Sequence, residues 1–544
     1  MSKQHQLFVK QAAILVFAGL LVRVIGFIYR LPLTNMIGDE GNGIYGAGYN
    51  LYIFFLIMSS AGLPAAISKM VSHRFALKQY ENAHRIFRVA LITAATAGLV
   101  CSLLLWFGAS FLADLVNSPR SVHAILTLAP TLLIVSIMAV FRGYFQGMNN
   151  TLPTAISQIV EQVFNAIFSV LLAFVLLRQT QDLALGAAGG TAGTGVGAMA
   201  GLLTIMAVYM KMSPQFKKQR LEDDGAAPQE RHVTLLAELV KTTVPIIIGT
   251  AIFSITNLID MAMVNTLLLQ SGYAQVEVDR MYGMLTGKYV TLTTLPVTIS
   301  TAIATASVPN IARSIAINDK AGANRKINLA LRLTMMVSVP AAVGIGVLAG
   351  PILLMLFPDF PDGEYLLQIG ALSIIFLALT QIVTGMLQGS GYVQVPAIAA
   401  FFGALVKIPL NYLLIPLDYI VVFGFAFEMN VAGAVISTTA CYAVASAINL
   451  VVLKRIMGKG ARLDLVSGFG KPLAAATAMG VFCFASYRLF YMLLSSNTLA
   501  CLIAIAIGMG VYFGCMVKTK GIVRDDVIMM PFGKKIVKIW DRFA

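Results

Sequence analysis

Long apolar runs, separated by short polar segments, extend along the chain as far as residue 517. The runs Ala12–Tyr29, Val89–Leu115, Leu372–Met386 and Ala500–Val517 consist mainly of Leu, Ile, Val, Ala, Phe and Met. A helix needs about 20 such residues to cross the hydrocarbon core of a bilayer. In lipid every backbone polar group must be satisfied within the segment, so runs of this kind must be helices. The pattern therefore predicts an all-α polytopic membrane protein.

The same pattern places about fourteen transmembrane spans. We expect them at residues 12–33, 44–64, 89–113, 122–142, 154–177, 184–210, 242–268, 284–307, 330–356, 366–387, 396–416, 431–453, 472–494 and 498–517. Only 12% of the residues are charged, against about 25% in soluble domains. Water is therefore not the main solvent of this chain.

The distribution of basic residues predicts the topology. With the N-terminus inside, 31 of the 39 Lys and Arg residues fall in cytoplasmic segments, as the positive-inside rule requires. We therefore expect a protein of the plasma membrane with both termini in the cytoplasm. The net charge of +15 is explained in this way, and we expect no nucleic-acid partner.

Two short motifs suggest that the chain contains a repeat. Tyr144-Phe-Gln146-Gly147 precedes Pro153 and a span, and Met386-Leu-Gln388-Gly389 precedes Pro396 and a span. Six spans separate the copies, an even number, which predicts a parallel repeat with a site between the two bundles. The expected division is a six-helix bundle, a cytoplasmic linker, a second six-helix bundle, and two extra helices with a basic tail: 1–210, 211–241, 242–455 and 456–544.

Polar residues inside the spans are the candidate site, because each buried charge costs about 2.5–3.5 kcal/mol on insertion scales. The fifth span carries a polar stripe at spacing i, i+3, i+4, i+7. The candidate substrate-binding residues are Arg23, Arg30, Lys288, Lys407, Asn165, Asn411, Gln158 and Gln162. The candidate residues for ion coupling are Glu161, Asp260 and Asn257.

These residues come from both predicted bundles, so we expect them to line one central cavity. Its excess of cations suits an anionic substrate such as a diphosphate, because Arg offers phosphate a bidentate fork and Lys a mobile point charge. The alternative is structural ion pairing, for example between Glu161 and Lys407, and Arg30 has the further alternative of snorkelling to the outer interface. No phosphate-binding loop or metal-ligand spacing occurs, so we expect no cofactor, no metal and no enzymatic activity.

Two glycine patterns predict local structure. Gly189, Gly193, Gly197 and Gly201 are spaced by four residues in the sixth span, which predicts a close helix–helix seam. The segment 38–43, which contains three glycines, predicts a turn after the first span.

Four segments in this order resemble the MurJ-type lipid II flippases, and more closely the Gram-positive branch grouped with stage V sporulation protein B and polysaccharide-export proteins. They are Arg23-Val-Ile-Gly-Phe-Ile-Tyr-Arg30, the Gly38/Gly43 turn, Gly62-Leu-Pro64 and Leu348-Ala-Gly-Pro351. The resemblance extends over nearly the whole chain. It implies the fold of the multidrug/oligosaccharidyl-lipid/polysaccharide exporter superfamily, with two extra spans, 13 and 14, that form a groove for a lipid tail.

The resemblance also implies a function. Such proteins flip an undecaprenyl-diphosphate-linked glycan, here the peptidoglycan precursor lipid II, across the membrane by alternating access without ATP. Arg23 matches the arginine of the family's first span, and Arg30 is one position from a second. The arginine expected in span 2 is absent, since Ile57 and its neighbours are apolar, and Lys288 is the candidate replacement for a missing Asp-Arg pair in span 8.

Several further expectations follow, and the substrate has alternatives. Membrane potential, Na⁺ or H⁺ is the expected driving force, and membrane lipids and cell-wall synthesis enzymes are the expected partners of a monomer. The glycan can instead be a teichoic acid, capsule or spore-cortex precursor. A cation-coupled drug exporter fits less well because twelve spans are usual there. A membrane-embedded transferase would need an intramembrane His or a carboxylate cluster, and the sequence has neither.

Overall fold

The computed structural model describes residues 3–221, 229–316, 319–392, 394–422, 425–457, 466–519 and 521. The chain divides into two compact units, Met1–Gly283 and Met284–Ala544, which we call unit 1 and unit 2 and describe separately. The acidic part of the predicted linker and the basic C-terminal tail lie outside the described residues.

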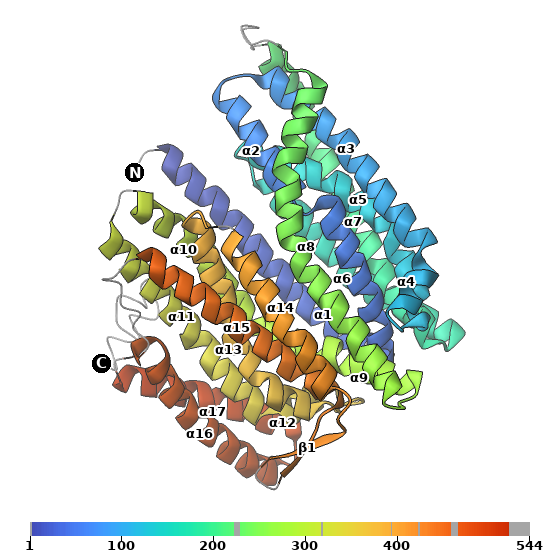
Figure 1. Ribbon diagram of the computed structural model, residues 1–544, viewed down its shortest axis with the longest axis vertical. Helices are drawn as coiled ribbons and strands as arrows, with labels where there is room; N and C mark the ends of the chain where they lie inside the picture. The colour runs from blue at the N-terminus through green and yellow to red at the C-terminus, as the bar shows by residue number, and fades with distance from the viewer. Residues whose placement is uncertain are drawn as a thin grey trace. The chain divides into compact units, whose positions relative to one another are not determined.

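Unit 1 consists of long helices that run side by side (Figure 1). Its elements are α1 (Lys3–Ser60), α2 (Leu63–Ala76), α3 (Tyr80–Phe107), α4 (Ala109–Leu115), the 3₁₀ turn η1 (Pro119–Ser121), α5 (Val122–Gly147), α6 (Leu152–Thr180), α7 (Leu183–Leu221), α8 (His232–Gln270) and α9 (Gln275–Gly283). The predicted linker 211–241 is therefore helical at both ends, because its flanking polar residues continue α7 and begin α8.

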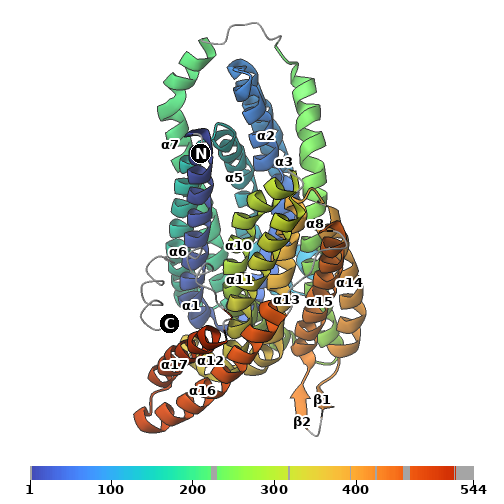
Figure 2. The same cartoon turned by 90° about the vertical axis from the view of Figure 1, so that its left-hand side faces the viewer.

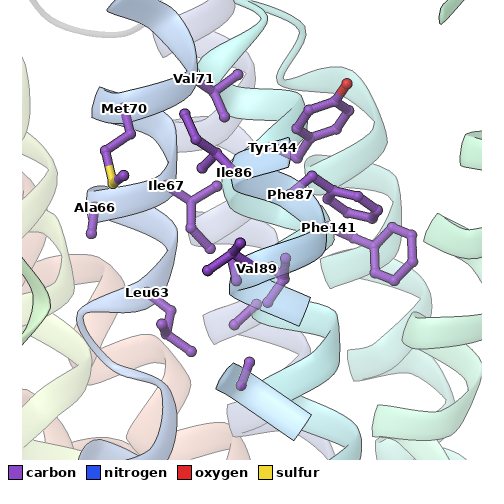
Figure 3. Packing of buried hydrophobic residues seen from close by; sticks show 14 of the residues in the cluster. Leu63, Ala66, Ile67, Met70, Val71, Ile86, Phe87, Val89, Phe141 and Tyr144 are labelled. Atoms are coloured by element: carbon purple, nitrogen blue, oxygen red, sulfur yellow. The ribbon is translucent and has the colours of Figure 1, made fainter. Parts of the chain in front are cut away.

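The core of unit 1 joins α2, α3 and α5. Ile67 and Val71 of α2 lie next to Ile86 of α3, and on the other side of α3 the Phe87 ring lies beside Tyr144 of α5 (Figure 3). The ring centroids of Phe87 and Tyr144 are 4.8 Å apart, within the range in which aromatic pairs add to the energy of burial. This packing holds the three helices as one scaffold.

Helix α1 bends at Gly38, the one residue within it that has non-helical backbone angles (φ 67°, ψ −173°). Glycine adopts a positive φ without the steric cost of a Cβ atom. The Asn42 side chain donates to the Gly38 carbonyl at 2.7 Å, which stabilises the bend. The turn predicted over 38–43 is therefore wrong in its extent: the chain kinks at one residue and continues as a helix.

Unit 2 is also helical, with one short hairpin (Figure 2). Its elements are the π-helix η2 (Met284–Tyr289), α10 (Val290–Ala316), α11 (Lys320–Val347), α12 (Ala349–Leu356), α13 (Glu364–Gly389), α14 (Gln394–Leu414), the antiparallel strands β1 (Tyr419–Val422) and β2 (Phe425–Glu428), α15 (Asn430–Met457), the π-helix η3 (Val466–Gly470), α16 (Lys471–Leu494) and α17 (Asn497–Lys518). The core lies between α10, α11, α13 and α15. Helices α16 and α17 form a pair that contacts α11 and α12.

The membrane character of the fold is confirmed. Eleven helical stretches of the described residues are long and apolar enough to cross a membrane, and the first of them, Ile14–Ala76, covers two predicted spans. Helices α8 and α10 occupy two more predicted positions, 242–268 and 284–307, although they are not among the eleven. A helix thus lies at each predicted span, and the count of fourteen stays a prediction.

The compact units differ from the predicted bundles, because α8 groups with unit 1. Near one end of α8, Glu238 forms an ion pair with Arg74 of α2 at 2.6 Å. Near its other end, the Asn265 side chain donates to the Val116 carbonyl at 2.9 Å. The repeat itself stays a prediction, although its two motifs, which end at Gly147 and Gly389, also end α5 and α13.

Candidate functional site

The polar stripe of the fifth predicted span lies on α6, along its seam with α7. A Cβ atom on Gly193 would lie 2.2 Å from the Ser169 backbone nitrogen, and one on Gly197 would lie 2.5 Å from the Glu161 carbonyl oxygen. Such approaches leave no room for a side chain, so the glycines let the two helices come close together. The predicted helix–helix seam is confirmed, and it determines where Glu161 lies.

Glu161 forms an ion pair with Arg142 of α5. The Arg142 Nη2 atom lies 2.6 Å from Glu161 Oε2 and donates to Ser157 Oγ at 2.8 Å. The predicted span ends at residue 142, but α5 continues to Gly147, so Arg142 lies within the helix, five residues before its end. The structure thus contains an ion pair at Glu161, which was the alternative interpretation of this residue, and the partner is Arg142 of the same unit.

A row of polar groups continues along this seam. The Ser169 hydroxyl donates to Asn165 Oδ1 at 2.8 Å, and the Thr194 hydroxyl lies 3.5 Å from the same oxygen. Between α5 and α7, the hydroxyls of Thr127 and Thr191 are 2.7 Å apart. Asn165 is therefore engaged within the seam, where buried polar groups must find partners.

The two candidate arginines of α1 have different surroundings. Arg23 is exposed, whereas the Arg30 guanidinium lies 4.6 Å above the centre of the Tyr45 ring. In a straight helix, fifteen residues would separate Arg30 from Tyr45 by about 22 Å. The bend at Gly38 brings them together, and the Tyr29 hydroxyl hydrogen-bonds to that of Tyr45.

The part of α1 that follows the bend at Gly38, its second arm, presents tyrosines to the polar stripe on α6. Tyr49 and Tyr52 have ring centroids 5.8 Å apart, and both lie close enough to Glu161 to interact with it electrostatically. The first arm of α1, before Gly38, also approaches α6: a Cβ on Gly26 would lie 3.4 Å from the Gln162 amide nitrogen.

We call this grouping the α1–α6 site. It consists of Arg30, Tyr45, Tyr49, Tyr52, Arg142, Glu161 and Gln162. Gln158, the remaining member of the stripe, is half-buried. In the predicted topology it lies on the cytoplasmic side of Glu161.

The candidate coupling residues of α8 lie elsewhere in unit 1. Asn257 is exposed and Asp260 is half-buried. Asp260 interacts electrostatically with Tyr282 of α9, whose hydroxyl accepts a hydrogen bond from the Asn50 side chain at 2.8 Å. Asp260 therefore lies near α9 and the second arm of α1.

Lys288 is buried in the π-helix of unit 2, with 1% of its surface exposed. Its ammonium donates to the carbonyls of Phe360 and Asp362 at 2.6 and 3.0 Å and lies 5.7 Å from the centre of the Phe357 ring. Carbonyl acceptors around a buried ammonium hold the loop before α13 against η2. These contacts favour a structural role for Lys288.

Lys407 and Asn411 lie one turn apart on α14 and are both buried. Helix α14 packs against α15, where a Cβ on Gly403 of α14 would lie 2.8 Å from the Cys441 carbonyl oxygen. The predicted i, i+4 pair therefore shares a face of α14, as expected from helical periodicity.

Sequence reasoning missed Arg142 and the tyrosines of α1. Arg142 lies at the end of the predicted span and was assigned to the cytoplasmic side, so it was not considered as a site residue. Tyr45, Tyr49 and Tyr52 carry a usable signal, because their spacing of i, i+4, i+7 puts three polar aromatic tips on one helix face. For metals, no three His, Cys, Asp or Glu side chains gather at one place within the described part of the chain.

Comparisons with known proteins match nearly the whole chain. The family model described as "Polysaccharide biosynthesis protein" matches residues 8–315, and the model described as "MatE" matches residues 245–413. A Bacillus subtilis (strain 168) protein named "Uncharacterized membrane protein YabM" is 27% identical over 546 residues, which cover 99% of this chain and 98% of that protein.

Two further matches come from proteins named for a substrate. "Lipid II flippase MurJ" of Bacillus subtilis (strain 168) is 25% identical over 475 residues, which cover 84% of both chains. The solved structure of "Lipid II flippase MurJ, inward closed conformation" aligns with a TM-score of 0.61 at 16% identity, over 92% of this chain and 99% of that one. At that identity the structural match shows the fold.

Proposed function

We propose a function from one premise: the chain belongs to the polysaccharide biosynthesis protein family, whose model covers residues 8–315. It is a member of the multidrug/oligosaccharidyl-lipid/polysaccharide exporter superfamily, as the resemblance implied, and its relatives are flippases and transporters rather than enzymes. We propose that this protein moves lipid II from the cytoplasmic to the outer leaflet by alternating access. The name of its Bacillus subtilis relative supports this substrate.

The α1–α6 site is the observation that carries the proposal. It places Arg30 and the Arg142–Glu161 ion pair around Tyr49, which interacts electrostatically with both Arg30 and Glu161, on helices that are largely apolar. Arg23 adds a third guanidinium on α1. Cations are costly in a membrane, and a diphosphate offers arginine side chains negative charge through bidentate contacts.

The Arg142–Glu161 pair suggests how substrate and driving ion are coupled. A phosphate oxygen accepts the same hydrogen bonds as a carboxylate oxygen, so a bound diphosphate can replace Glu161 on Arg142. Glu161, once released, is free to take up H⁺ or Na⁺. Asp260 with Asn257 is the second candidate pair for ion coupling, and membrane potential is the alternative driving force.

Lys407 and Asn411 are proposed as substrate ligands of unit 2, whereas Lys288 must first give up its two carbonyl partners to reach a phosphate. The prenyl tail is proposed to lie along α16 and α17, whose exposed side chains are largely apolar. These exposed residues include Leu473, Val481, Phe482, Phe484, Leu489, Leu499, Leu502 and Met509.

We propose a monomer in the plasma membrane with both termini in the cytoplasm, working beside cell-wall synthesis enzymes. Another polyprenyl-linked glycan is the alternative substrate, namely a teichoic acid, capsule or spore-cortex precursor. The match of residues 245–413 to the MatE model favours cation-coupled drug export as a second candidate function. Cation-driven drug uptake into everted vesicles, without any flipping of lipid-linked glycan, would support drug export instead.

The test is complementation of a strain depleted of its lipid II flippase. Depletion of this protein in its own host should make the corresponding lipid-linked precursor accumulate in the cytoplasmic leaflet. The variants Arg23→Gln and Lys407→Gln should fail to complement, because each removes a proposed phosphate ligand. Arg178→Gln is the matched control, since the Arg178 guanidinium lies 5.8 Å from the centre of the Phe174 ring at the exposed end of α6 and Arg178 is not among the proposed ligands. Full complementation by both ligand variants would refute the proposed binding mode.

A further inference from the structure

The short segment between α4 and α5 connects three other parts of unit 1. The Asn117 side chain donates to the Thr266 hydroxyl of α8 at 2.7 Å. The Asn117 carbonyl accepts from the Gln275 side chain of α9 at 3.2 Å. Arg120, three residues later, reaches both α1 and α9. Residues 116–120 are therefore a hub at the end of the bundle that the predicted topology places outside.

The hub carries an ion cluster. Arg120 forms an ion pair with Glu40 of α1, and its Nη1 atom lies 3.4 Å from Asp279 Oδ2 of α9. The other Asp279 oxygen accepts from the Gln275 side chain at 3.0 Å. The Asp279 side chain is 3% exposed, whereas those of Glu40 and Arg120 are 24% and 31% exposed. The Asp279 carboxylate is thus the most buried of these three charged groups.

The backbones of α1 and α9 touch directly beneath this cluster. A Cβ on Gly43 would lie 1.9 Å from the Asp279 carbonyl oxygen, and one on Gly283 would lie 1.7 Å from the Asp39 carbonyl oxygen. Such contacts exist only while the two helices are fully closed on each other. The cluster and the two glycines therefore describe one closed state of this end of unit 1.

We propose that Glu40, Asn117, Arg120, Gln275 and Asp279 form a proton-sensitive clasp that holds α1, the 116–120 segment and α9 together, with Asp279 as its proton-binding residue. The role of the clasp in transport rests on the proposed function, because alternating access requires one face of the protein to close when the other opens. The clasp itself is a property of unit 1 and is testable without substrate.

The charges around Asp279 determine the direction of the pH effect. Burial raises the pKa of Asp279 to about 6, while the hydrogen bond from Gln275 and the charge of Arg120 oppose this rise and Glu40 adds to it. Asp182 at the start of α7 also acts on Arg120. The remaining charged groups of α9 are Glu277 and Arg280, which pair with each other at 3.9 Å.

A raised pKa means that the closed clasp binds a proton more tightly than an open, hydrated one. Acidification therefore favours the closed state. With a pKa of about 6 when closed and the ordinary value of 3.8 when open, the ratio of closed to open protein rises about tenfold between pH 7.5 and pH 5. The effect is lost above pH 7, where both states carry the carboxylate.

The test measures the distance between two spin labels in nanodiscs without substrate. Leu115→Cys and Val276→Cys carry the labels, because both positions are exposed, one directly before the 116–120 segment and the other on α9. The five native cysteines are replaced in this background. The closed population should rise about tenfold relative to the open one from pH 7.5 to pH 5. In Asp279→Asn, which mimics the protonated form, the closed population should be high at both pH values.

Glu277→Gln is the matched control, since it changes an acid to its amide on the same helix outside the clasp and should titrate like the parent protein. The proposal is overturned if Asp279→Asn titrates like the parent, if acid opens the clasp, or if the distances do not change with pH. These distances do not depend on flipping. A clasp that titrates in a protein without flippase activity would refute the proposed function alone, and the converse result would refute the clasp alone.

Discussion

Neutralising Glu161 should destabilise the protein by leaving the largely buried Arg142 guanidinium without its carboxylate partner. The change Glu161→Gln keeps the shape of the side chain but removes the charge that lies 2.6 Å from the guanidinium. Breaking a fully buried ion pair costs about 3–5 kcal/mol. Here the two side chains are 14% and 26% exposed, so solvent screens part of the interaction, and we expect about 2 kcal/mol.

A double-mutant cycle separates the pair from other effects of each change. Arg142→Gln should also cost about 2 kcal/mol, because it leaves Glu161 charged and unpaired. The double variant Arg142→Gln/Glu161→Gln should cost less than the sum of the single changes by about 1–3 kcal/mol, the coupling expected of two groups in contact. The measurement is thermal or denaturant unfolding of purified protein in nanodiscs.

The control is Arg178→Gln at the end of α6. Arg178 is exposed, and its guanidinium lies 5.8 Å from the centre of the Phe174 ring. That change should be nearly neutral. Additive effects of Arg142→Gln and Glu161→Gln would refute the ion pair. Additivity would also contradict the proposal that a bound diphosphate replaces Glu161 as the hydrogen-bond acceptor of Arg142.

Three further predictions follow from single contacts. Gly193→Ala should destabilise by about 1–3 kcal/mol relative to Gly510→Ala in the same unfolding assay, since only the first Cβ meets backbone, at 2.2 Å; equal effects would contradict the α6–α7 seam. Lys288→Met should lower the melting temperature, because it leaves two loop carbonyls without their donor, at about 1–3 kcal/mol each; an unchanged melting temperature would contradict the structural role. The hydrogen bond from Arg74 lowers the pKa of Glu238 below its ordinary 4.5, so this carboxylate stabilises the protein above that pH and the contribution is lost as the pH falls through the lowered pKa. Glu238→Gln should accordingly reduce stability at pH 7 and flatten its acid dependence, and an acid dependence like that of the parent protein would contradict the ion pair.

Much of the fold followed from local patterns. The structure has a helix at each position where a long apolar run predicted a span, since a backbone in lipid has few alternatives. The glycines from Gly189 to Gly201 predicted a helix seam because their spacing repeats once per turn. Helix ends did not follow from the span boundaries: the span that ends at residue 142 belongs to a helix that continues to Gly147.

The candidate site was predicted in its residue types but not in its pairing. The stripe on α6 and the arginines of α1 were visible as polar positions in apolar helices, whose cost marks them as functional candidates. Periodicity gives the face of a helix but not the helix that lies opposite. The approach of Arg30 to Tyr45 depends on a single backbone angle at Gly38, which no local pattern of hydrophobicity records.

The sequence by itself determined that this is a polytopic helical membrane protein with cationic side chains in its spans, because hydrophobic length and the cost of buried charge are properties of segments. Only the tertiary structure decided which of those charges meet. It paired Arg142 with Glu161, buried Lys288 against two carbonyls, and joined Glu40, Arg120 and Asp279 across three elements. The physical reason is that a partner is chosen by packing between helices far apart in the chain, where glycine contacts and a kink set distances of a few ångströms.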